Sequence, residues 1–200
     1  MTALDQFDAV VGRFGKVAGY AIGGSVLTPV VIAASGMAPT WPDGLPFITS
    51  VLMLAILILT FHFLTTRRRW VFSILLVMSC VALVGSIGGY SYARGTFVVN
   101  SRLTGEPLTL GCRFRSDIVM YARKTGLDSA SQCPGNDFRE ILEKAENDPT
   151  QVWTETSIAN VAYVIALLWL GIFTALALFI GSFVIWYTRQ PGFSENADMP

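Results

Sequence analysis

The residues best suited to redox chemistry in this chain are Cys112 and Cys133, which lie in one polar segment. In an oxidising compartment two such thiols form either a structural disulfide or a redox-active pair. A redox pair usually has a Cys-X-X-Cys spacing or a basic neighbour that stabilises the thiolate, and here only Arg113 and Arg115 could act in that way. We therefore expect a structural disulfide, which contributes about 3 kcal/mol in the loop-entropy model.

The other reactive groups do not form a set. His62 is the only histidine, and it lies far along the chain from both cysteines, just before the basic run Arg67–Arg69. A zinc site requires several clustered Cys, His or carboxylate ligands, and nucleophilic catalysis requires a base beside the nucleophile. The sequence offers neither, so we expect no catalytic residue, no metal site and no bound cofactor, and hence a protein that is not an enzyme.

The elements that must position these residues are apolar helices. Only 14% of the residues are charged, against about 25% in soluble domains, and the mean hydropathy is +0.53. A bilayer core about 30 Å thick needs about 20 apolar residues of helix to cross it. In lipid the backbone groups must bond within each segment, which favours helices. Four stretches have this length: Val17–Gly36, Phe47–Leu64, Trp70–Tyr92 and Ile158–Tyr187.

The sequence therefore predicts an all-α membrane protein with four transmembrane helices and a small α+β extracytoplasmic insert between helices 3 and 4. Its parts are an amphipathic segment at 1–16, transmembrane helices 1–3 at 17–92, the insert at 93–157, transmembrane helix 4 at 158–188 and a cytoplasmic tail at 189–200. The amphipathic segment either lies on the inner membrane surface or extends the first span.

The insert contains both strand and helix patterns. Thr96–Asn100 and Pro107–Phe114 have strand character and are separated by a turn signal, which predicts a hairpin. A short helix is expected at Asp117–Lys124 and a second at Asp137–Asn147, ended by the pair Asp148-Pro149. A unit of this size buries little surface alone, so we expect it to depend on its disulfide or on neighbouring elements.

Basic residues gather at one end of the predicted spans: Arg13, Lys16, Arg67, Arg68, Arg69 and Arg189. The short connection Met37–Pro46 contains no Lys or Arg. By the positive-inside rule both termini and the turn Arg67–Arg69 are cytoplasmic, and the insert is periplasmic, in a bacterial inner membrane. The basic turn is expected to contact anionic lipid headgroups, at about 1 kcal/mol per side chain, or to dock a cytoplasmic protein.

Small residues recur at helical spacing on the predicted spans. Helices in lipid associate through close van der Waals approach, which glycine permits. We expect helix association at Gly15, Gly19, Gly23, Gly85, Gly89, Gly171 and Gly181. The pattern leaves open whether the contacting helices belong to one chain or to two copies. Cys80, in the middle of the third span, is expected to be a small packed residue.

These features predict a non-enzymatic polytopic membrane protein that self-associates through small-residue helix faces. It would act as a membrane sensor or accessory subunit, in an envelope-stress or phage-defence setting. The expected partners are the lipid bilayer, further copies of the chain and a cytoplasmic or periplasmic protein. Nucleic acid is not among them, because the net charge is +0 and the only basic run is Arg67–Arg69.

Two alternatives stay open. An oligomeric pore or ion channel can be gated by apolar constriction alone. An ion-coupled transporter is disfavoured, because the centres of the spans contain no Asp, Glu, Lys or Arg. A periplasmic thiol redox protein would use Cys112 and Cys133.

The layout of four spans with an outer cysteine pair before the last span resembles the membrane thiol oxidases of the bacterial disulfide-forming pathway. That family also carries a Cys-X-X-Cys pair in its first outer loop, which passes electrons to a quinone. The corresponding loop here, Ala38–Pro46, contains no cysteine. We therefore do not assign the chain to that family.

Overall fold

The computed structural model of this chain describes residues 23–24, 27–39, 42, 44–64, 69–101, 105–124, 133, 142, 145–146 and 148–188. The chain divides into two compact units. The helical unit comprises Met1–Ala38, Gly44–Ser86 and Leu170–Pro200, and the insert unit comprises Pro39–Asp43 and Ile87–Trp169.

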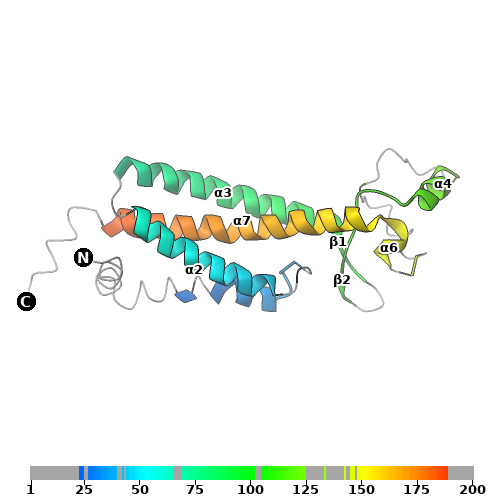
Figure 1. The fold of residues 1–200 in the computed structure, drawn as a ribbon, viewed down its shortest axis with the longest axis horizontal. Coiled ribbons are helices and arrows are strands. Elements are labelled where there is room, and N and C mark those ends of the chain that lie inside the picture. Colours follow the sequence, from blue (N-terminus) through cyan, green and yellow to red (C-terminus); the bar gives the residue numbers. More distant parts are fainter. Residues whose placement is uncertain are drawn as a thin grey trace, which may run out of the picture. The chain divides into compact units, whose positions relative to one another are not determined.

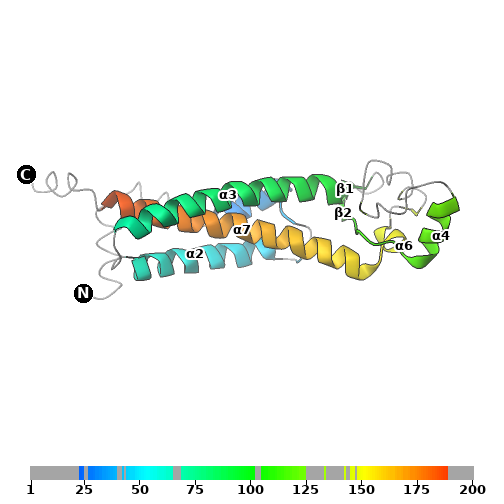
Figure 2. The ribbon, with the colours of Figure 1, turned by 90° about the horizontal axis from the view of Figure 1, so that it is seen from above.

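Three long helices dominate the described residues: α2 (Leu45–Leu64), α3 (Arg69–Phe97) and α7 (Glu155–Thr188). Each is long and apolar enough to cross a membrane. Within each unit, Figures 1 and 2 show the parts of α3 and α7 that belong to it side by side. The second, third and fourth predicted spans are therefore confirmed as helices of spanning length.

The predicted bounds of two spans need correction where polar residues begin. α3 continues past Tyr92 as far as Phe97. α7 begins at Glu155, one turn before the predicted Ile158. Hydropathy reports how far a segment is apolar, whereas a helix continues as long as its backbone hydrogen bonds are made. The two helices therefore reach farther into the polar part of the chain than the sequence indicated.

α2 also starts earlier than predicted, because Gly44 and Pro46 shape its first turn. Gly44 has a φ of +79°, a conformation that glycine adopts without steric cost. Its carbonyl accepts hydrogen bonds from the backbone N–H of Phe47 (3.0 Å) and of Ile48 (3.2 Å). Pro46 lies in the first turn, where its missing N–H removes no helical hydrogen bond. The Pro-rich connection thus leads directly into the helix.

Only part of the first predicted span, Val17–Gly36, falls within the described residues. Residues 23–24 and 27–34 are helical, and Pro29 is fully buried. Gly36 has a φ of +75°, the left-handed conformation that commonly follows a last helical turn. The helical residues thus end at Ala34, two before the predicted Gly36, and a complete first span stays a prediction.

α7 is the most buried of the three long helices. In its apolar stretch 39% of the residues are buried, against 33% in α2 and 11% in α3. Within the helical unit, Phe61 of α2, Phe72 of α3 and Ile185 of α7 form one buried cluster. A large part of the surface of α3 is therefore left uncovered within a single chain.

Hydroxyl groups on the apolar helices bond to their own backbone. Each Oγ1 donates at 2.7 Å to the carbonyl one turn earlier in the pairs Thr28 to Gly24, Thr49 to Leu45 and Thr60 to Ile56. A hydroxyl that is satisfied in this way is cheap to place in an apolar medium. These polar residues are therefore compatible with helices that face lipid.

The insert unit contains the predicted hairpin in shortened form. β1 (Val98–Asn100) pairs antiparallel with β2 (Pro107–Thr109), and Val99 lies opposite Leu108. The turn closes at Gly105, whose φ is +72°. Both predicted strands were too long. α3 extends to Phe97 and so includes the beginning of the first predicted strand. After Thr109 the chain leaves β2, and Phe114 pairs with Trp153 instead. Figure 1 shows the two short strands beside each other, close to the end of α3.

Two short helices follow the hairpin. α4 (Ser116–Lys124) agrees with the predicted helix at Asp117–Lys124. Most of the predicted helix Asp137–Asn147 lies outside the described residues. Asp148 was predicted to end a helix, but it caps the N-terminus of another, α6 (Pro149–Val152). Proline suits the first position of a helix as well as the position after one, so the sequence was ambiguous at this point.

The insert unit has a small apolar core of its own. Leu110, Phe114, Leu142, Val152 and Trp153 are buried together. Partly buried apolar side chains complete the cluster, namely Val99, Ile118, Val119, Ala145 and Ile158. Because α7 contributes Ile158, the core includes the first turn of that helix. The insert therefore does not depend on its disulfide alone.

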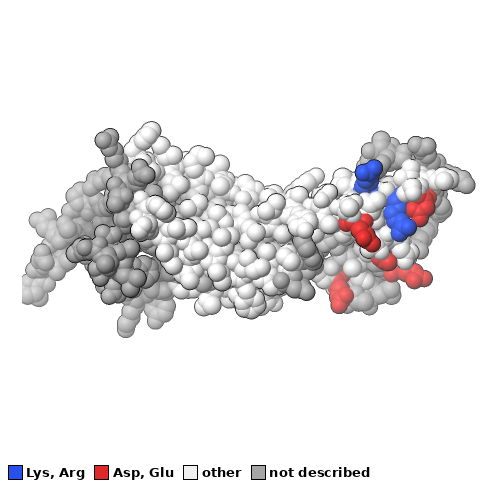
Figure 3. Space-filling view, viewed as in Figure 1, with Lys and Arg blue, Asp and Glu red and all other residues white. Residues whose placement is uncertain are grey.

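Charge is confined to the insert unit among the side chains that the structure describes. These are Arg94, Glu106, Arg113, Arg115, Asp117, Glu146, Asp148 and Glu155. Figure 3 shows the same contrast on one face, where the blue and red atoms belong to the insert unit and the described surface of the helical unit is white. Such an uncharged helical surface is what a lipid environment requires.

Candidate functional site

The disulfide predicted from the sequence is present. The sulfur atoms of Cys112 and Cys133 are bonded at 2.01 Å. Cys112 is half-buried and Cys133 is exposed. Cys112 directly follows Leu110 and Gly111, which are both buried, so one end of the bond is attached to the edge of the insert core.

The backbone beside the disulfide is fixed to the start of α7. The Oγ of Ser157 accepts two hydrogen bonds, from the backbone N–H of Cys112 (2.6 Å) and from that of Arg113 (2.9 Å). Ser157 lies in the first turn of α7 and is 9% exposed. Because this hydroxyl is nearly buried, few water molecules could replace it as an acceptor.

The same segment pairs with the residues that precede α7. Phe114 and Trp153 form an antiparallel bridge. On either side of it, the N–H of Arg115 donates to the carbonyl of Val152 (3.0 Å), and the N–H of Thr154 donates to the carbonyl of Arg113 (2.9 Å). Residues 111–115 thus lie along the connection between α6 and α7.

Close packing accompanies these hydrogen bonds. Trp153 is completely buried, and its ring stacks on that of Phe114 with centroids 6.1 Å apart. A Cβ atom at Gly111 would lie 2.7 Å from Cβ of Trp153 and 2.9 Å from Oγ of Ser157. Both distances are shorter than van der Waals contact, so glycine is required here for close approach. We call Gly111–Arg115 together with Val152–Ser157 the α7 junction.

A polar cap supports the junction from the side of α6. The carboxylate of Asp148 accepts hydrogen bonds from Oγ1 of Thr150 (2.7 Å) and from its backbone N–H (2.9 Å). These two bonds, the side-chain one first, lower the pKa of Asp148 below its usual range. Arg115 donates to the carbonyl of Thr150 (3.3 Å) and lies 3.5 Å from the exposed carboxylate of Asp117.

The glycines predicted to associate helices fall into different surroundings. A Cβ atom at Gly89 would lie 3.2 Å from Leu168, one at Gly171 would lie 3.1 Å from Oγ of Ser86, and one at Gly181 would lie 2.8 Å from Thr60. These three glycines therefore serve contacts within the chain. A Cβ atom at Gly23 or at Gly85 would meet nothing within 4 Å.

Several other predicted site residues lie outside the residues that the structure describes. Gly15, Gly19, Arg67 and Arg68 are among them, and of Arg69 only the backbone is described, at the first position of α3. A role for the basic turn in binding lipid or a cytoplasmic protein stays a prediction.

Two further residues on the long helices bear on chemistry. His62 is in the last turn of α2, where its ring meets the edge of Phe63. Cys80 is exposed on α3, which corrects the expectation that it is packed. In the described part of the chain, no group of three or more His, Cys, Asp or Glu side chains lies close enough to hold a metal ion.

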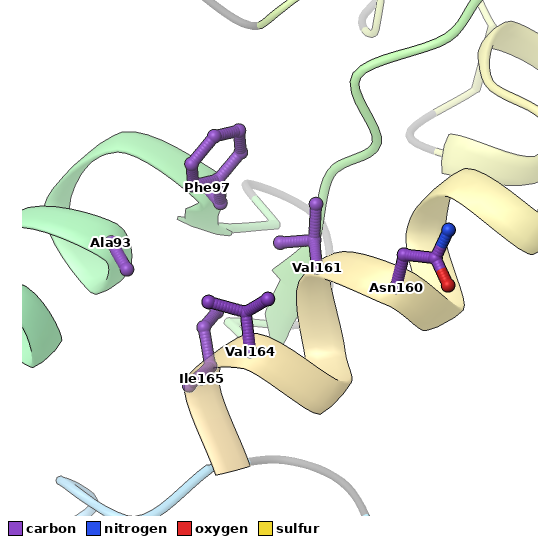
Figure 4. A pocket seen from close by; sticks show the side chains of 6 residues that line it. All are labelled: Ala93, Phe97, Asn160, Val161, Val164 and Ile165. Carbon is purple, nitrogen blue, oxygen red and sulfur yellow. The ribbon is translucent and has the colours of Figure 1, made fainter. Parts of the chain in front are cut away.

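The insert unit also contains a pocket between the end of α3 and the beginning of α7. Its volume is about 240 Å³. Ala93 and Phe97 form one wall, and Asn160, Val161, Val164 and Ile165 form the other. Figure 4 shows Ala93 and Phe97 across from Val161, Val164 and Ile165, with the Asn160 amide directed away from them toward the start of α7. The lining is otherwise apolar.

One aromatic pair lies just beyond this pocket. Tyr90 precedes Ala93 by one turn of α3, and Trp169 follows Ile165 by one turn of α7. The two rings approach to 5.7 Å between centroids, and both residues are nearly buried. The two helices are therefore in contact one turn beyond the end of the pocket that Ala93 and Ile165 form.

Sequence reasoning missed most of the α7 junction. Ser157 and Thr154 have no local signature, because their partners are more than 40 residues away along the chain. Gly111 offered one signal, since a glycine between Leu110 and Cys112 interrupts a strand pattern, which often marks close backbone approach. Asn160 offered another as a lone amide near the start of an apolar run.

Comparison with known proteins provides no relative from which a function could be transferred: no protein-family model, no curated protein and no solved structure matches this chain. The function must therefore be inferred from the residues and geometry described above.

Proposed function

We propose that the protein is a non-enzymatic membrane sensor or accessory subunit, in which the insert responds to a signal or partner and α7 carries the response across the membrane. The supporting observation is the pair of hydrogen bonds from Cys112 and Arg113 to Ser157. Because Ser157 is in the first turn of a 34-residue helix, a displacement of the disulfide-bonded segment acts on that helix directly.

The proposed topology follows the sequence prediction. Four spans cross a bacterial inner membrane, both termini are cytoplasmic and the insert is periplasmic. The disulfide supports this placement, because such bonds persist in oxidising compartments. The basic turn Arg67–Arg69 supports it from the other side. An envelope-stress or phage-defence role fits an insert that is the first part of the protein to meet a change outside the cytoplasm.

We also propose that the protein self-associates through the uncovered side of α3. Gly85 and Gly88 are exposed, and a Cβ atom at either would meet nothing within 4 Å. Exposed glycines one turn apart on an apolar helix allow a second helix to approach closely. A second copy of the chain would cover this surface better than lipid, whose chains cannot follow the groove that two glycines leave.

Cross-linking in native membranes tests self-association. We expect the dimer fraction to fall when Gly85 is replaced by leucine, because the larger side chain separates the helices. Cys80→Leu is the matched control, since Cys80 is also exposed on α3 but lies about 1.4 turns away, on another side of the helix. A Gly85→Leu variant that cross-links as well as the wild type would rule out this interface.

Replacing both disulfide cysteines by serine separates the structural role from the redox alternative. A structural bond predicts lower abundance and a lower unfolding temperature, because the unfolded chain gains freedom. A redox centre predicts a normally folded protein that has lost its function.

Conductance across planar bilayers by the purified wild-type protein would instead support the pore alternative.

A further inference from the structure

The exposed tryptophan and tyrosine side chains of α3 and α7 lie near the ends of the apolar stretches of these helices. They are Trp70 and Tyr92 on α3, and Tyr163 and Trp186 on α7. Every other tryptophan or tyrosine whose side chain the structure describes is buried, namely Tyr90, Trp153 and Trp169. Exposed rings of these two types are typical of the membrane–water interface, where the ring contacts lipid and its polar atom contacts water. The four exposed rings are therefore markers for the two surfaces of a bilayer.

The spacing of these rings along each helix matches the thickness of a bilayer. Trp70 and Tyr92 are about 22 residues apart in α3, which corresponds to about 33 Å of helix. Tyr163 and Trp186 are about 23 residues apart in α7, or about 35 Å. Both lengths slightly exceed a hydrocarbon core of about 30 Å, so the rings reach the headgroup layers. The sequence between the two rings of each helix contains no Asp, Glu, Lys or Arg.

In the helical unit, the two tryptophans lie at one level. Phe72 of α3 and Ile185 of α7 belong to one buried cluster. Trp70 comes just before Phe72, and Trp186 comes directly after Ile185. The helices run in opposite directions, and within this unit the end of α7 lies beside the start of α3 (Figure 1). Both tryptophans therefore lie just beyond the same cluster, and we call them together the tryptophan rim.

In the insert unit, the two tyrosines lie at nearly one level. A Cβ atom at Gly89 would lie 3.2 Å from Leu168, which gives the register of the two helices there. Tyr92 follows Gly89 by nearly one turn of α3, and Tyr163 precedes Leu168 by almost one and a half turns of α7. These two offsets differ by about two residues, or about 3 Å along the helices. One membrane surface can therefore contact both rings, which we call the tyrosine rim.

The exposed side chains of α7 change in character at the tyrosine rim. Four exposed residues share one face of the helix at spacings of three and four: Thr156, Asn160, Tyr163 and Leu167. This face is polar before Tyr163 and apolar after it. Between Tyr92 and Tyr163, the large apolar side chains that the structure describes are all buried or partly buried except Met120. Exposed apolar surface on the long helices therefore ends at the tyrosine rim.

We propose that the headgroup layers of the bilayer contact the protein at the tryptophan rim and at the tyrosine rim. The stretches of α3 and α7 between the rims lie in the hydrocarbon core. The last turn of α3 and the first two turns of α7, Glu155–Ala162, stand outside that core on the side of the insert. The placement rests on the proposed crossing of the membrane by these helices, but it requires neither self-association nor signalling.

This placement assigns the pocket and the α7 junction to different depths. The pocket contains Val164 and Ile165 on one side of the tyrosine rim and Phe97 and Asn160 on the other, so it lies at the headgroup layer. Ser157 is about six residues beyond Tyr163, or about 9 Å farther from the hydrocarbon core. A soluble partner can therefore reach the junction without entering the acyl chains.

Spin labels on matched positions test where the hydrocarbon core ends. The full-length protein, with Cys80 replaced by alanine, carries one label at Asn160→Cys or at Leu167→Cys and is reconstituted in phospholipid nanodiscs. These two positions share a face of α7. We expect the label at 167 to collide mainly with oxygen, which concentrates in acyl chains, and the label at 160 to collide severalfold more often with a water-soluble nickel chelate. Val84→Cys and Gly95→Cys form the corresponding pair on α3, and both of these positions are exposed.

Oxygen-dominated collisions at both positions of a pair would place the core beyond the tyrosine rim and would overturn the proposal. Nickel-dominated collisions at both positions would overturn it too, because the core would then end before the rim or would be absent.

Two methionines of similar exposure separate a misplaced rim from a protein that does not cross the membrane. Met78 of α3 lies between the rims and is 61% exposed, and Met120 of α4 is 66% exposed. The wild-type protein in nanodiscs is treated with hydroxyl radicals generated in the water phase, and we expect oxidation of Met120 with Met78 protected. Equal oxidation would overturn the proposed membrane crossing together with both rims. Protection of Met78 combined with oxygen-dominated collisions at position 160 would overturn the tyrosine rim alone.

Discussion

Gly111 and Ser157 meet where the chain leaves β2 and where it enters α7. Gly111 supplies space and Ser157 supplies an acceptor. Only the glycine leaves a signal in the sequence, where it interrupts a strand pattern. Ser157 serves two backbone N–H groups that its own helix does not use. Gly111 allows the backbone to approach Trp153 closely enough for those bonds to form. The close contact between residues 111–115 and the start of α7 therefore depends on two small residues and not on the disulfide alone.

The first prediction concerns the space at Gly111. Gly111→Ala should lower the free energy of unfolding by about 1–3 kcal/mol, because the added methyl group must displace Trp153 or Ser157. The measurement is thermal or denaturant unfolding in detergent, followed by tryptophan fluorescence. Gly95→Ala is the control, since a Cβ atom at Gly95 meets nothing within 4 Å. An equal loss of stability in both variants would contradict the role of close approach.

The second prediction concerns the acceptor at Ser157. Ser157→Ala should cost about 1–3 kcal/mol, because two N–H groups near the core lose their partner. Thr156→Ala removes a hydroxyl from the exposed neighbouring position and should change stability little. Hydrogen exchange at Cys112 and Arg113 should accelerate only in the first variant. Unchanged protection of these two amides would show that another acceptor replaces the hydroxyl.

The third prediction follows from the depressed pKa of Asp148. A carboxyl group whose folded pKa lies below its unfolded value of 3.8 stabilises the fold above that value, and the contribution is lost as the pH falls through the folded pKa. Asp148→Asn keeps a capping side chain but cannot titrate. The unfolding temperature of the variant should therefore fall less steeply below about pH 4 than that of the wild type. Identical pH profiles would contradict the assignment.

At the scale of elements, the glycines of α7 and those of α3 have different surroundings. Gly171 and Gly181 of α7 lie against Ser86 of α3 and Thr60 of α2, so this helix is held by its neighbours within the chain. Gly85 and Gly88 of α3 have no such neighbour. The same small-residue pattern thus occurs both at contacts within the chain and on an uncovered surface of α3, and only the distances to other side chains distinguish the two cases.

The fourth prediction tests the contact between α2 and α7. Gly181→Ala should destabilise the protein by about 1–3 kcal/mol, because the new methyl group would lie 2.8 Å from Cγ2 of Thr60. Thr60→Ser removes that methyl group and keeps the hydroxyl. The double variant should therefore recover about 1 kcal/mol relative to the sum of the single variants. Additive effects would show that the two residues do not touch.

The elements were predictable to different extents for physical reasons. Length and hydropathy located three long helices, because a helix that crosses a bilayer needs about 20 consecutive apolar residues, and such a run is visible in the sequence itself. The disulfide followed from composition, and the hairpin followed from its turn. The α7 junction was not predictable, because Arg113 and Thr154 find each other only after the chain has folded back. The cap at Asp148 was misread, because the same dipeptide can end one helix or begin another.

At the scale of the whole molecule, one chain combines apolar helices with a charged insert that has its own core. The insert core includes Ile158 of α7, so the polar unit is built around the beginning of a membrane-type helix. Three spanning helices between two cytoplasmic termini would be an odd number, which cannot return the chain to its starting side. The proposed topology therefore requires the first span, Val17–Gly36, to cross as well.

The last prediction decides that topology. A single cysteine is introduced at Ser129 in the insert or at Thr66 in the turn before α3, with Cys80 replaced by alanine, and intact cells are treated with an impermeant thiol reagent. We expect reaction at position 129 and none at position 66, because the proposed topology places the insert on the oxidising side and residue 66 in the cytoplasm. Lysed cells provide the control in which both positions react. Labelling at position 66 alone in intact cells would reverse the orientation and would leave the disulfide of Cys112 and Cys133 in a reducing compartment, where it would not persist.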